Sequence, residues 1–407
     1  MGDVTGLAIL GSTGSIGRQA LDVVRALPDH LRVTALACRS DVEQLEAQLA
    51  EHRPAAVWAE APPPGWMPPA GGTVDVAPLD ELVVRDDVDV VLVATTALAG
   101  LTPTLAALRA GKKVAIANKE VLVVAGAEVR RALAEGEPAG AELRPVDSEH
   151  SAIWQCLWGE RAESVEQLTL TASGGAFRDL APGELARVTP EQALAHPTWS
   201  MGRKVTVDSA TLFNKGLEAI EARWLFDVPL SRIDIVQHRE SVVHSMVRFV
   251  DGSVKAQLGE PDMRLPIQCA LTYPERLPAR HVAPLDLAVA GRLHFEAVDH
   301  ERFPALGLAL EAGRRADGSA AALSGADESA VAHFLAGRLG FTEIARLLRS
   351  ALDAHEPVAE DDLDALLGAE AWGRRFVDRA VDGRDPGRPA ATPAGDRVGG
   401  RDERLGT

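Results

Sequence analysis

LAILGSTGSIG, residues 7–17, is an apolar run that leads directly into three glycines at intervals of three residues. A buried first strand followed by such a turn and a helix is typical of dinucleotide-binding sheets. The glycines allow a tight turn and a close approach to a diphosphate, whose negative charge lies at the helix N-terminus. The alternative is a glycine-rich connection without a ligand, and the position after a first strand favours the binding site.

Short apolar runs alternate with helical patterns through the first 150 residues. Strands are expected at residues 6–10, 32–37, 55–59, 88–94 and 113–117, and helices at 18–27, 41–52, 101–110 and 120–134. This alternation predicts an α/β fold that begins with a doubly wound, parallel-sheet, NADP-binding domain over residues 1–150. Residues 61–72 hold five prolines and three glycines, so they are expected to form a loop.

The pattern changes after residue 150. A strand at 164–172, a helix at 209–226 and strands at 233–237, 241–250 and 253–258 predict an α+β catalytic domain over residues 151–282. Asp251-Gly252 predicts a hairpin between the last two strands. The glycine- and proline-broken segment 173–204 is interpreted as an irregular lid loop. Residues 283–382 predict a small C-terminal helical domain, and residues 383–407 a disordered tail.

The composition excludes several classes of function. Against 42 Lys and Arg stand 59 Asp and Glu, a formal charge of -17 that argues against nucleic-acid and anionic-membrane partners. No apolar run approaches the roughly 20 residues that span a bilayer, and the N-terminus has no basic region of a secretory signal. Cys38, Cys156 and Cys269 lie far apart, which fits a reducing compartment. The sequence therefore predicts a cytoplasmic protein that acts on a small molecule.

The end of the second strand indicates which dinucleotide is bound. An NAD enzyme places an acid there for the ribose 2′-hydroxyl. Here the strand ends in Cys38-Arg39-Ser40, so Arg39 and Ser40 are predicted to bind a 2′-phosphate, although Asp41 follows directly. The sequence favours NADPH over NADH.

An acidic cluster lies at residues 145–150, which we interpret as the end of a strand. Residues i and i+2 of a strand share a face, so Asp147 and Glu149 are expected to converge and to suit a divalent cation. A solvated acidic turn is an equal alternative for this stretch alone. A third acid can come from the predicted helix at 209–226, but its spacing does not separate Glu218 from Glu221.

The same helix and the lid add polar and aromatic groups. Asn214, Lys215 and Glu218 share a helix face that could bind a phosphate and a metal together. Trp199 and Met201 are suited to close over a flat ring, with core packing as the alternative for Trp199. His238 and His244 are interpreted as structural histidines.

Together, these motifs resemble the 1-deoxy-D-xylulose 5-phosphate reductoisomerase family. The resemblance covers residue 7 to about residue 380. It rests on seven motifs in order: GSTGSIG (11–17), ANKE (117–120), PVDSEHSAI (145–153), SGGAFR (173–178), HPTWSMG (196–202), VDSATLFNKGLEAIEA (207–222) and PDMRLPIQCALTYP (261–274).

The resemblance implies a role for each matching residue. It implies that Asp147, Glu149 and Glu218 bind Mg²⁺ or Mn²⁺, which selects Glu218 over Glu221, and that these three act in catalysis with Lys119 and His196. Implied substrate contacts are Lys119, Ser148, Glu149, Ser173, His196, Trp199, Met201, Ser209, Asn214, Lys215 and Glu218, of which Ser173, Ser209, Asn214 and Lys215 surround the phosphate. Implied NADPH contacts are Thr13, Gly14, Ser15, Ile16, Asn118, Glu120 and Gly202.

The implied activity is the NADPH- and metal-dependent conversion of 1-deoxy-D-xylulose 5-phosphate to 2-C-methyl-D-erythritol 4-phosphate in non-mevalonate isoprenoid biosynthesis. A homodimer and inhibition by fosmidomycin are also implied. One alternative is a divergent paralogue, an NADP-dependent oxidoreductase for another phosphorylated ketose. Another is an NADP-binding regulator, against which the acidic triad argues because a sensor needs no metal.

Four stretches of the chain differ from the usual pattern of the family. Arg39-Ser40-Asp41 replaces Gly-(Lys/Ser)-Asn after the second strand, and Ala97 replaces a glycine. Ala176 stands where proline is common, and Asp327-Glu328 replaces an Asn-Glu pair. None of these positions belongs to the implied metal or phosphate set.

Overall fold

The computed structural model describes residues 4–68 and 74–383. The predicted disordered tail, apart from Gly383, lies outside the described residues, as do residues 69–72 of the predicted loop. No helix within the described ranges combines the length and the apolar composition that crossing a membrane requires.

The N-terminal sheet has seven parallel strands in the order β4-β3-β2-β1-β5-β6-β7. The strands are β1 (Thr5–Leu10), β2 (Leu31–Cys38), β3 (Ala56–Ala59), β4 (Asp75–Val76), β5 (Val90–Val93), β6 (Lys113–Ile116) and β7 (Glu142–Pro145). β2, β3 and β4 are added in turn on one side of β1, and β5, β6 and β7 are added in turn on its other side. This order confirms the predicted doubly wound topology.

Helices cover both faces of this sheet because its central strands are apolar on both sides. Leu7 and Ile9 share one core with α1 (Ser15–Ala26) and α2 (Val42–His52). Ala8 and Leu10 face the opposite core, with α3 (Leu79–Val83), α4 (Leu101–Arg109) and α5 (Lys119–Gly136). Such two-sided burial explains the near-continuous hydrophobic runs that identify these strands in the sequence.

The glycine-rich turn joins β1 to α1 without any intervening loop. Gly11 has a φ of +86°, which an L-residue with a side chain adopts only with strain. A Cβ at Gly17 would lie 2.3 Å from the carbonyl oxygen of Gly11, so the helix packs directly on the turn. The helix begins at Ser15, three residues earlier than predicted, and this places Ser15 and Ile16 in its first turn.

The acidic stretch is not the end of a strand. β7 ends at Pro145, Asp147 caps α6 (Ser148–Leu157), and Glu149 lies in the first turn of that helix. The prediction that Asp147 and Glu149 share a strand face is therefore wrong. An acid at the cap position accepts from a free backbone N–H, and a second acid in the first turn interacts favourably with the helix dipole.

The second sheet contains β8 (Val165–Ala172), β9 (Ile233–Gln237), β10 (Val243–Phe249), β11 (Val254–Leu258) and β12 (Glu296–Ala297), in the order β11-β10-β8-β9-β12. The predicted hairpin joins β10 and β11. β8 and β9 are parallel, and the other pairs are antiparallel.

The predicted lid, residues 173–204, is irregular only in part. It contains the short 3₁₀ helix η4 (Pro182–Arg187) and α7 (Pro190–Ala193), and α8 (Arg203–Thr211) begins within it. Phe177, Leu185 and Ala193 are buried in the main hydrophobic core, so the first two thirds of the segment are anchored. The predicted helix at 209–226 is broken at Leu212, whose φ is +57°, and α9 (Phe213–Phe226) begins after it.

Residues 283–303 correct the predicted extent of the C-terminal helices. They hold α11 (Leu287–Ala290) and β12, which pairs with β9. The long helices are α12 (Pro304–Arg315), α13 (Ser319–Leu335), α14 (Phe341–Ala354) and α15 (Leu363–Asp382), while α10 (Arg264–Thr272) precedes this segment. The remaining short 3₁₀ helices are η1 (Ala97–Gly100), η2 (Glu137–Ala139), η3 (Ala162–Ser164) and η5 (Leu230–Arg232).

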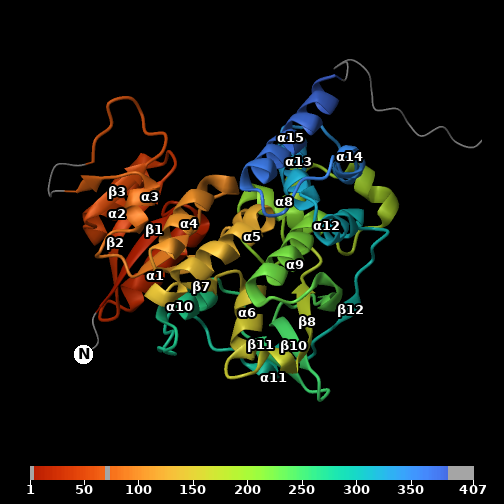
Figure 1. Cartoon of the computed structure of the whole chain (residues 1–407). Helices are drawn as coiled ribbons and strands as arrows, with labels where there is room; N and C mark the ends of the chain where they lie inside the picture. Colours follow the sequence, from red (N-terminus) through yellow and green to blue (C-terminus); the bar gives the residue numbers. More distant parts are fainter. Residues whose placement is uncertain (1–3, 69–73, 384–407) are drawn as a thin grey trace, which may run out of the picture.

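The three parts of the chain share cores. α10 packs on α1 and buries Ile267 in the first core, and one large core joins β8, α9 and α12–α15. Figure 1 shows the seven-stranded sheet at one end of the molecule and α12–α15 at the other, with α5, α6 and α9 between them.

Candidate active site

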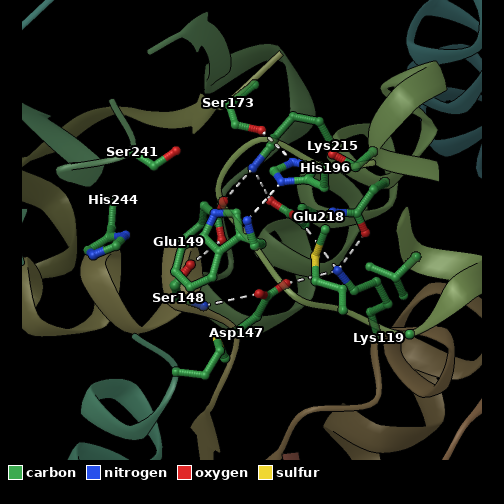
Figure 2. A pocket seen from close by; sticks show the side chains of 18 of the residues that line it. Lys119, Asp147, Ser148, Glu149, Ser173, His196, Lys215, Glu218, Ser241 and His244 are labelled. Atoms are coloured by element: carbon green, nitrogen blue, oxygen red, sulfur yellow. Dashed lines mark hydrogen bonds and ion pairs between the residues drawn. The ribbon is translucent and has the colours of Figure 1, made fainter. Parts of the chain in front are cut away.

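A pocket lies where the carboxyl end of the first sheet meets α6, α8 and α9. The sequence-predicted residues that line it are Ser15, Ile16, Lys119, Asp147, Ser148, Glu149, Ser173, His196, Trp199, Met201, Gly202, Ser209, Asn214, Lys215 and Glu218. Figure 2 shows the carboxylates of Asp147, Glu149 and Glu218 and the amines of Lys119 and Lys215, from the starts of α5 and α6 and from α9, pointing toward one another.

Three carboxylates converge at the centre of the pocket. Asp147 caps α6, Glu149 lies in the first turn of α6, and Glu218 comes from α9. One oxygen of each lies within 4.8 Å of an oxygen of the others. The predicted convergence is therefore present, but it is produced by a helix N-terminus and a neighbouring helix. An all-oxygen set of this kind suits a hard divalent cation.

Two lysines and one amide connect these carboxylates. Lys119 Nζ donates to Asp147 Oδ2 at 2.9 Å and to Asn214 Oδ1 at 2.7 Å. Lys215 Nζ donates to Glu149 Oε1 at 2.7 Å and to Glu218 Oε2 at 2.5 Å. Asn214 Nδ2 donates to Glu218 Oε1 at 2.6 Å, so the i, i+4 pair predicted on α9 is formed.

The charge balance of the cluster favours one more cation. Burial disfavours the Lys119 ammonium, but Asp147 and Glu218 outweigh burial and raise the pKa of Lys119 above its ordinary value. Lys119 lowers the pKa of Asp147 against the opposing effect of burial. Burial and the charge of Glu149 raise the pKa of Glu218 to about 8. Glu218 is thus a carboxylate that lacks sufficient positive charge nearby.

Glu218 and Glu221, which spacing could not separate, have different surroundings. Glu218 reaches the pocket, whereas Glu221 Oε2 lies 3.5 Å from His150 Nδ1, next to α6. His150 Nε2 in turn bonds the backbone carbonyl of Glu218 at 2.8 Å. A second group of close possible ligand atoms consists of Asp147, His150 and Glu221. His150 and Glu221 do not line the pocket.

His196 is held in one protonation state. Its Nδ1 accepts from the backbone N–H groups of Thr198 and Trp199 at 3.1 and 2.8 Å, so Nε2 must carry the hydrogen. Nε2 lies 3.1 Å from Ser173 Oγ and donates to it. Burial, assisted by Arg178, lowers the pKa of His196 to about 4. The imidazole is therefore neutral at physiological pH.

The Ser173 loop packs tightly on α8. A Cβ at Gly175, whose φ is +67°, would lie 2.4 Å from the carbonyl oxygen of Ser209. The N–H of Gly175 donates to Ser173 Oγ at 3.3 Å. Because Ser173 Oγ also accepts from His196, its own hydrogen remains able to donate to an anion in the pocket.

Trp199 and Met201 line the pocket and are half-buried. The indole lies against the His244 ring, with 6.1 Å between the ring centroids. His244, interpreted from the sequence as structural, is buried and also lines the pocket together with Ser241. His238 does have the predicted structural role, since its Nε2 accepts from two backbone N–H groups and its Nδ1 bonds the carbonyl of His294.

Ser241, His244 and Met263 are pocket residues that sequence reasoning did not find. Ser241 and His244 lie at the start of β10, and Met263 precedes α10. Each is brought to the pocket by packing between distant segments. The only local signal was the histidine itself.

The predicted dinucleotide contacts occupy several positions. Thr13 and Gly14 form the turn itself, and Gly202 caps α8 at the rim of the pocket. Arg39 and Ser40 are exposed just beyond β2. The carboxylate of Asp41 accepts from the N–H of Gln44 at 3.2 Å as the cap of α2, so this acid has a structural role.

Asn118 and Glu120 flank Lys119 at the start of α5. The Asn118 side-chain amide donates to Thr95 and to the carbonyl of Ala97, which fixes the loop after β5. Glu120 is directed toward Lys204, with 3.7 Å between Oε1 and Nζ. Both side chains thus have partners within the described structure.

The chain matches three family models that cover most of its length. Residues 7–63 and 71–126 match 1-deoxy-D-xylulose 5-phosphate reductoisomerase, residues 143–226 match its C-terminal domain, and residues 258–376 match the DXP reductoisomerase C-terminal domain. The protein named 1-deoxy-D-xylulose 5-phosphate reductoisomerase of Geobacillus kaustophilus is 49% identical over 377 residues, which are 91% of this chain and 98% of that protein. The protein of the same name from Thermomicrobium roseum is 50% identical over 383 residues, 92% and 98% of the two chains.

Solved structures agree with the sequence comparisons. A DOX-P reductoisomerase in complex with NADPH, fosmidomycin and magnesium superimposes with a TM-score of 0.85 at 38% identity, covering 93% of this chain and 98% of that chain. The 1-deoxy-D-xylulose 5-phosphate reductoisomerase of Zymomonas mobilis in complex with NADPH also gives 0.85 at 38% identity, covering 93% and 100%.

Proposed function

The chain belongs to the 1-deoxy-D-xylulose 5-phosphate reductoisomerase family, and from this premise we propose how its pocket performs the reaction. The protein is an NADPH- and divalent-metal-dependent oxidoreductase that converts 1-deoxy-D-xylulose 5-phosphate to 2-C-methyl-D-erythritol 4-phosphate. The observation that carries the assignment of roles is the convergence of three carboxylates with Lys119 and Lys215 at the carboxyl end of a dinucleotide-binding sheet.

We assign the divalent cation to Asp147, Glu149 and Glu218. Their oxygen donors fit Mg²⁺ or Mn²⁺, and the raised pKa of Glu218 indicates that the cluster is short of positive charge. When bound, the cation stabilises negative charge that develops on substrate oxygens while the carbon–carbon bond is broken and remade. Lys119, which stays protonated, offers a second positive charge beside the same oxygens.

We assign the substrate phosphate to the end of the pocket formed by Ser173, Ser209, Asn214 and Lys215. The Ser173 hydroxyl is free to donate because neutral His196 already donates to its oxygen. Lys215 supplies charge, although it is shared with Glu149 and Glu218. Binding the phosphate away from the reacting carbons orients the substrate, and that orientation lowers the barrier.

The lid role belongs to residues 196–202, a shorter segment than the sequence suggested. Trp199 and Met201 lie over the pocket, and Gly202 joins them to α8. This segment would exclude water while the aldehyde intermediate receives hydride. Ser15 and Ile16 line the pocket on the side of the first sheet and Gly202 lines it on the side of the lid, so we assign the nicotinamide to the space between the glycine-rich turn and the lid.

The division of labour along the chain is a proposal of the same kind. Residues 1–150 would bind NADPH, residues 151–282 would supply the metal and substrate groups, and residues 283–382 would support them. The seven-stranded sheet, whose last strand ends at Pro145, supports the first boundary. The shared core supports a rigid connection between the last two parts.

We also propose a homodimer in the cytoplasm. β11 forms one edge of the second sheet, and Val250, Val254 and Leu258 on and beside it are exposed. An edge strand of this kind can pair with a second copy. The three cysteines are free, which fits a reducing compartment. Light scattering during gel filtration should give twice the chain mass, and a single chain mass would exclude the dimer.

The test of the function is NADPH oxidation by the purified protein. We expect oxidation only when 1-deoxy-D-xylulose 5-phosphate and Mg²⁺ or Mn²⁺ are both present, and we expect a chelator to stop it. D-Xylulose 5-phosphate, which differs by one hydroxyl, is the matched control for the paralogue hypothesis. Faster oxidation with that control would contradict the assigned substrate.

A further inference from the structure

Lys204 lies in the first turn of α8, where a positive charge is unfavourable to the helix dipole. Its Nζ lies 2.7 Å from Asp208 Oδ2 on the same helix and 3.0 Å from Asp327 Oδ2 on α13. Glu120 Oε1, on α5, lies 3.7 Å away. One ammonium therefore connects three helices that belong to different parts of the chain.

The charges of this cluster do not balance if every acid is ionised. Asp208 and Asp327 are both completely buried, whereas Glu120 retains some exposure. Among the described residues, Lys204 is the one cation within ion-pair distance of either aspartate. Two buried carboxylates with one ammonium leave a net negative charge, which is costly for side chains that bulk solvent does not reach.

A shared proton removes this excess charge. Because Asp208 Oδ2 and Asp327 Oδ2 contact the same Nζ, the two carboxyls are neighbours, and a proton on one can be shared with the other while Lys204 neutralises the remaining charge. Burial raises the pKa of Asp208, and burial together with the charge of Asp208 raises that of Asp327. The ionisable groups facing the pair are Lys119 and Glu120 from α5 and Lys204 from α8.

The position of the cluster connects it to the pocket. Asp208 directly precedes Ser209, which lines the pocket, and Glu120 directly follows Lys119. Lys204 lies two residues after Gly202, where the lid segment 196–202 ends. A displacement of α8 relative to α5 would therefore move one end of the lid and one phosphate contact together.

We propose that Lys204, Asp208 and Asp327 form a positioning cluster in which the two aspartates share one proton and fix α8, with the lid and Ser209, to α5 and α13. The three residues touch no substrate and act through the helix that they hold. This inference rests on the function proposed above for its kinetic consequence, but its protonation state can be measured without turnover.

The first experiment compares the pH dependence of thermal unfolding of wild type and Asp327→Asn. A carboxyl whose pKa is raised in the folded protein binds a proton that the unfolded chain has lost, so wild-type stability falls as pH rises toward the folded pKa. The amide that this substitution introduces is neutral at every pH and can still donate to Asp208. The melting temperature of Asp327→Asn relative to wild type should therefore increase as pH rises above about 4, where an aspartate of the unfolded chain ionises, and should level off above the folded pKa.

Glu328→Gln is the matched control, because Glu328 is adjacent on α13 but pairs with Arg374 away from the cluster. Its melting curve should stay parallel to that of wild type across pH. If Asp327→Asn is also parallel to wild type, the shared proton is refuted. Refuting the shared proton would not affect the proposed enzymatic function. Conversely, an absence of turnover in wild type would not affect the unfolding measurement.

The second experiment uses the two single variants and their combination. Asp208→Asn and Asp327→Asn each leave one carboxylate for Lys204. The loss of thermal stability in the double variant should therefore exceed the sum of the losses in the two single variants. The double variant leaves Lys204 with Glu120 alone. It should raise KM for the substrate and lower kcat/KM by about tenfold to a hundredfold, the scale expected for misplaced substrate groups.

Kinetics separate positioning from general stability. In wild type the KM for substrate should rise relative to that of Asp327→Asn as pH increases and the shared proton is lost, while the KM for NADPH should change equally in both. Additive effects of the two Asn substitutions, or a pH profile of the substrate KM that is identical in wild type and Asp327→Asn, would overturn the proposal.

Discussion

Replacing Glu218 with Gln tests the metal assignment at its most informative residue. The two side chains have nearly the same shape, and the amide oxygen can keep the 2.6 Å bond from Asn214. In the wild type Lys215 Nζ donates to Glu218 Oε2 at 2.5 Å. In the variant the amide nitrogen would face this ammonium, and because both groups are donors only, they cannot form a hydrogen bond. The substitution therefore removes one negative charge and one ammonium contact without removing volume.

The expected loss of metal affinity can be worked out from these charges. A unit negative charge about 4 Å from a divalent cation contributes about 8 kcal/mol at an effective dielectric of about 20, and the desolvation of both groups offsets part of this, so metal binding should weaken by at least about 10²- to 10³-fold. The pKa of Glu218 is raised to about 8 in the metal-free protein, so protons compete with the metal below that pH. Wild-type affinity should rise by up to about tenfold per pH unit toward pH 8 and level off above it. Glu218→Gln should lack the part of this rise that Glu218 contributes.

Electron paramagnetic resonance of Mn²⁺ measures this affinity directly, and quenching of protein fluorescence measures NADPH binding. NADPH should bind Glu218→Gln nearly as well as wild type, since the predicted dinucleotide contacts lie elsewhere, while turnover should be abolished. Glu221→Gln, one turn further along α9, is the matched control and should retain more Mn²⁺ affinity because Glu221 faces His150. The assignment is wrong if Glu218→Gln binds Mn²⁺ like wild type, or if it loses NADPH as severely as activity.

Three further predictions concern the cofactor, the lid and the backbone. Arg39→Ala should reduce the preference for NADPH over NADH by about tenfold, because a charge-assisted hydrogen bond contributes about 1.5–3 kcal/mol and exposed Arg39 belongs at the low end of this range. Steady-state kinetics with both cofactors measure this preference, and an unchanged ratio would show that other residues bind the 2′-phosphate. Trp199→Ala should raise the KM for substrate and weaken the binding of fosmidomycin, while lowering the free energy of unfolding by well under the roughly 3–5 kcal/mol that truncation of a core Trp costs. A loss of that size in urea unfolding without ligands would show that Trp199 is a core residue. Ala97→Gly should stabilise the protein by up to about 1 kcal/mol, since Ala97 has a φ of +51° that costs about 1–2 kcal/mol and Gly is more flexible when unfolded; a lower urea midpoint would contradict this.

The first sheet could be predicted because its signals are local. Leu7, Ala8, Ile9 and Leu10 are all buried, so β1 reads as a continuous apolar run that leads into the glycine-rich turn. Two-sided burial repeats in β5, which is equally apolar. The apolar runs indicate the strands but not their order or direction, which we inferred from the general topology of doubly wound sheets.

The acidic cluster shows how a correct site can rest on an incorrect element. Asp147 followed by Ser148 and Glu149 is a helix N-terminus signal, with an acid at the cap and another in the first turn. The strand-like stretch 142–146 that precedes it favoured a longer strand. The carboxylates still converge because α9 brings Glu218 to the same helix end.

Other features depend on contacts between distant segments and have no local signal. His244 and Ser241 reach the pocket because β10 pairs with β8, which ends at the Ser173 loop. The segment at 173–204 looks irregular from its glycines and prolines, yet Phe177 and Leu185 anchor it in the main core. The pairing of Lys204 with Asp327 joins α8 to α13, two helices that lie far apart in the sequence.

The carbon skeleton of the product tests the central claim most directly. Purified protein is incubated with ¹³C-labelled 1-deoxy-D-xylulose 5-phosphate, NADPH and Mg²⁺, and the product is examined by nuclear magnetic resonance. We predict the branched 2-C-methyl-D-erythritol 4-phosphate, because in the proposed assignment a cation on the three carboxylates, together with Lys119, would hold the substrate oxygens beside the migrating bond before reduction. An unbranched sugar alcohol phosphate, formed by reduction of the ketone without rearrangement, would contradict the account.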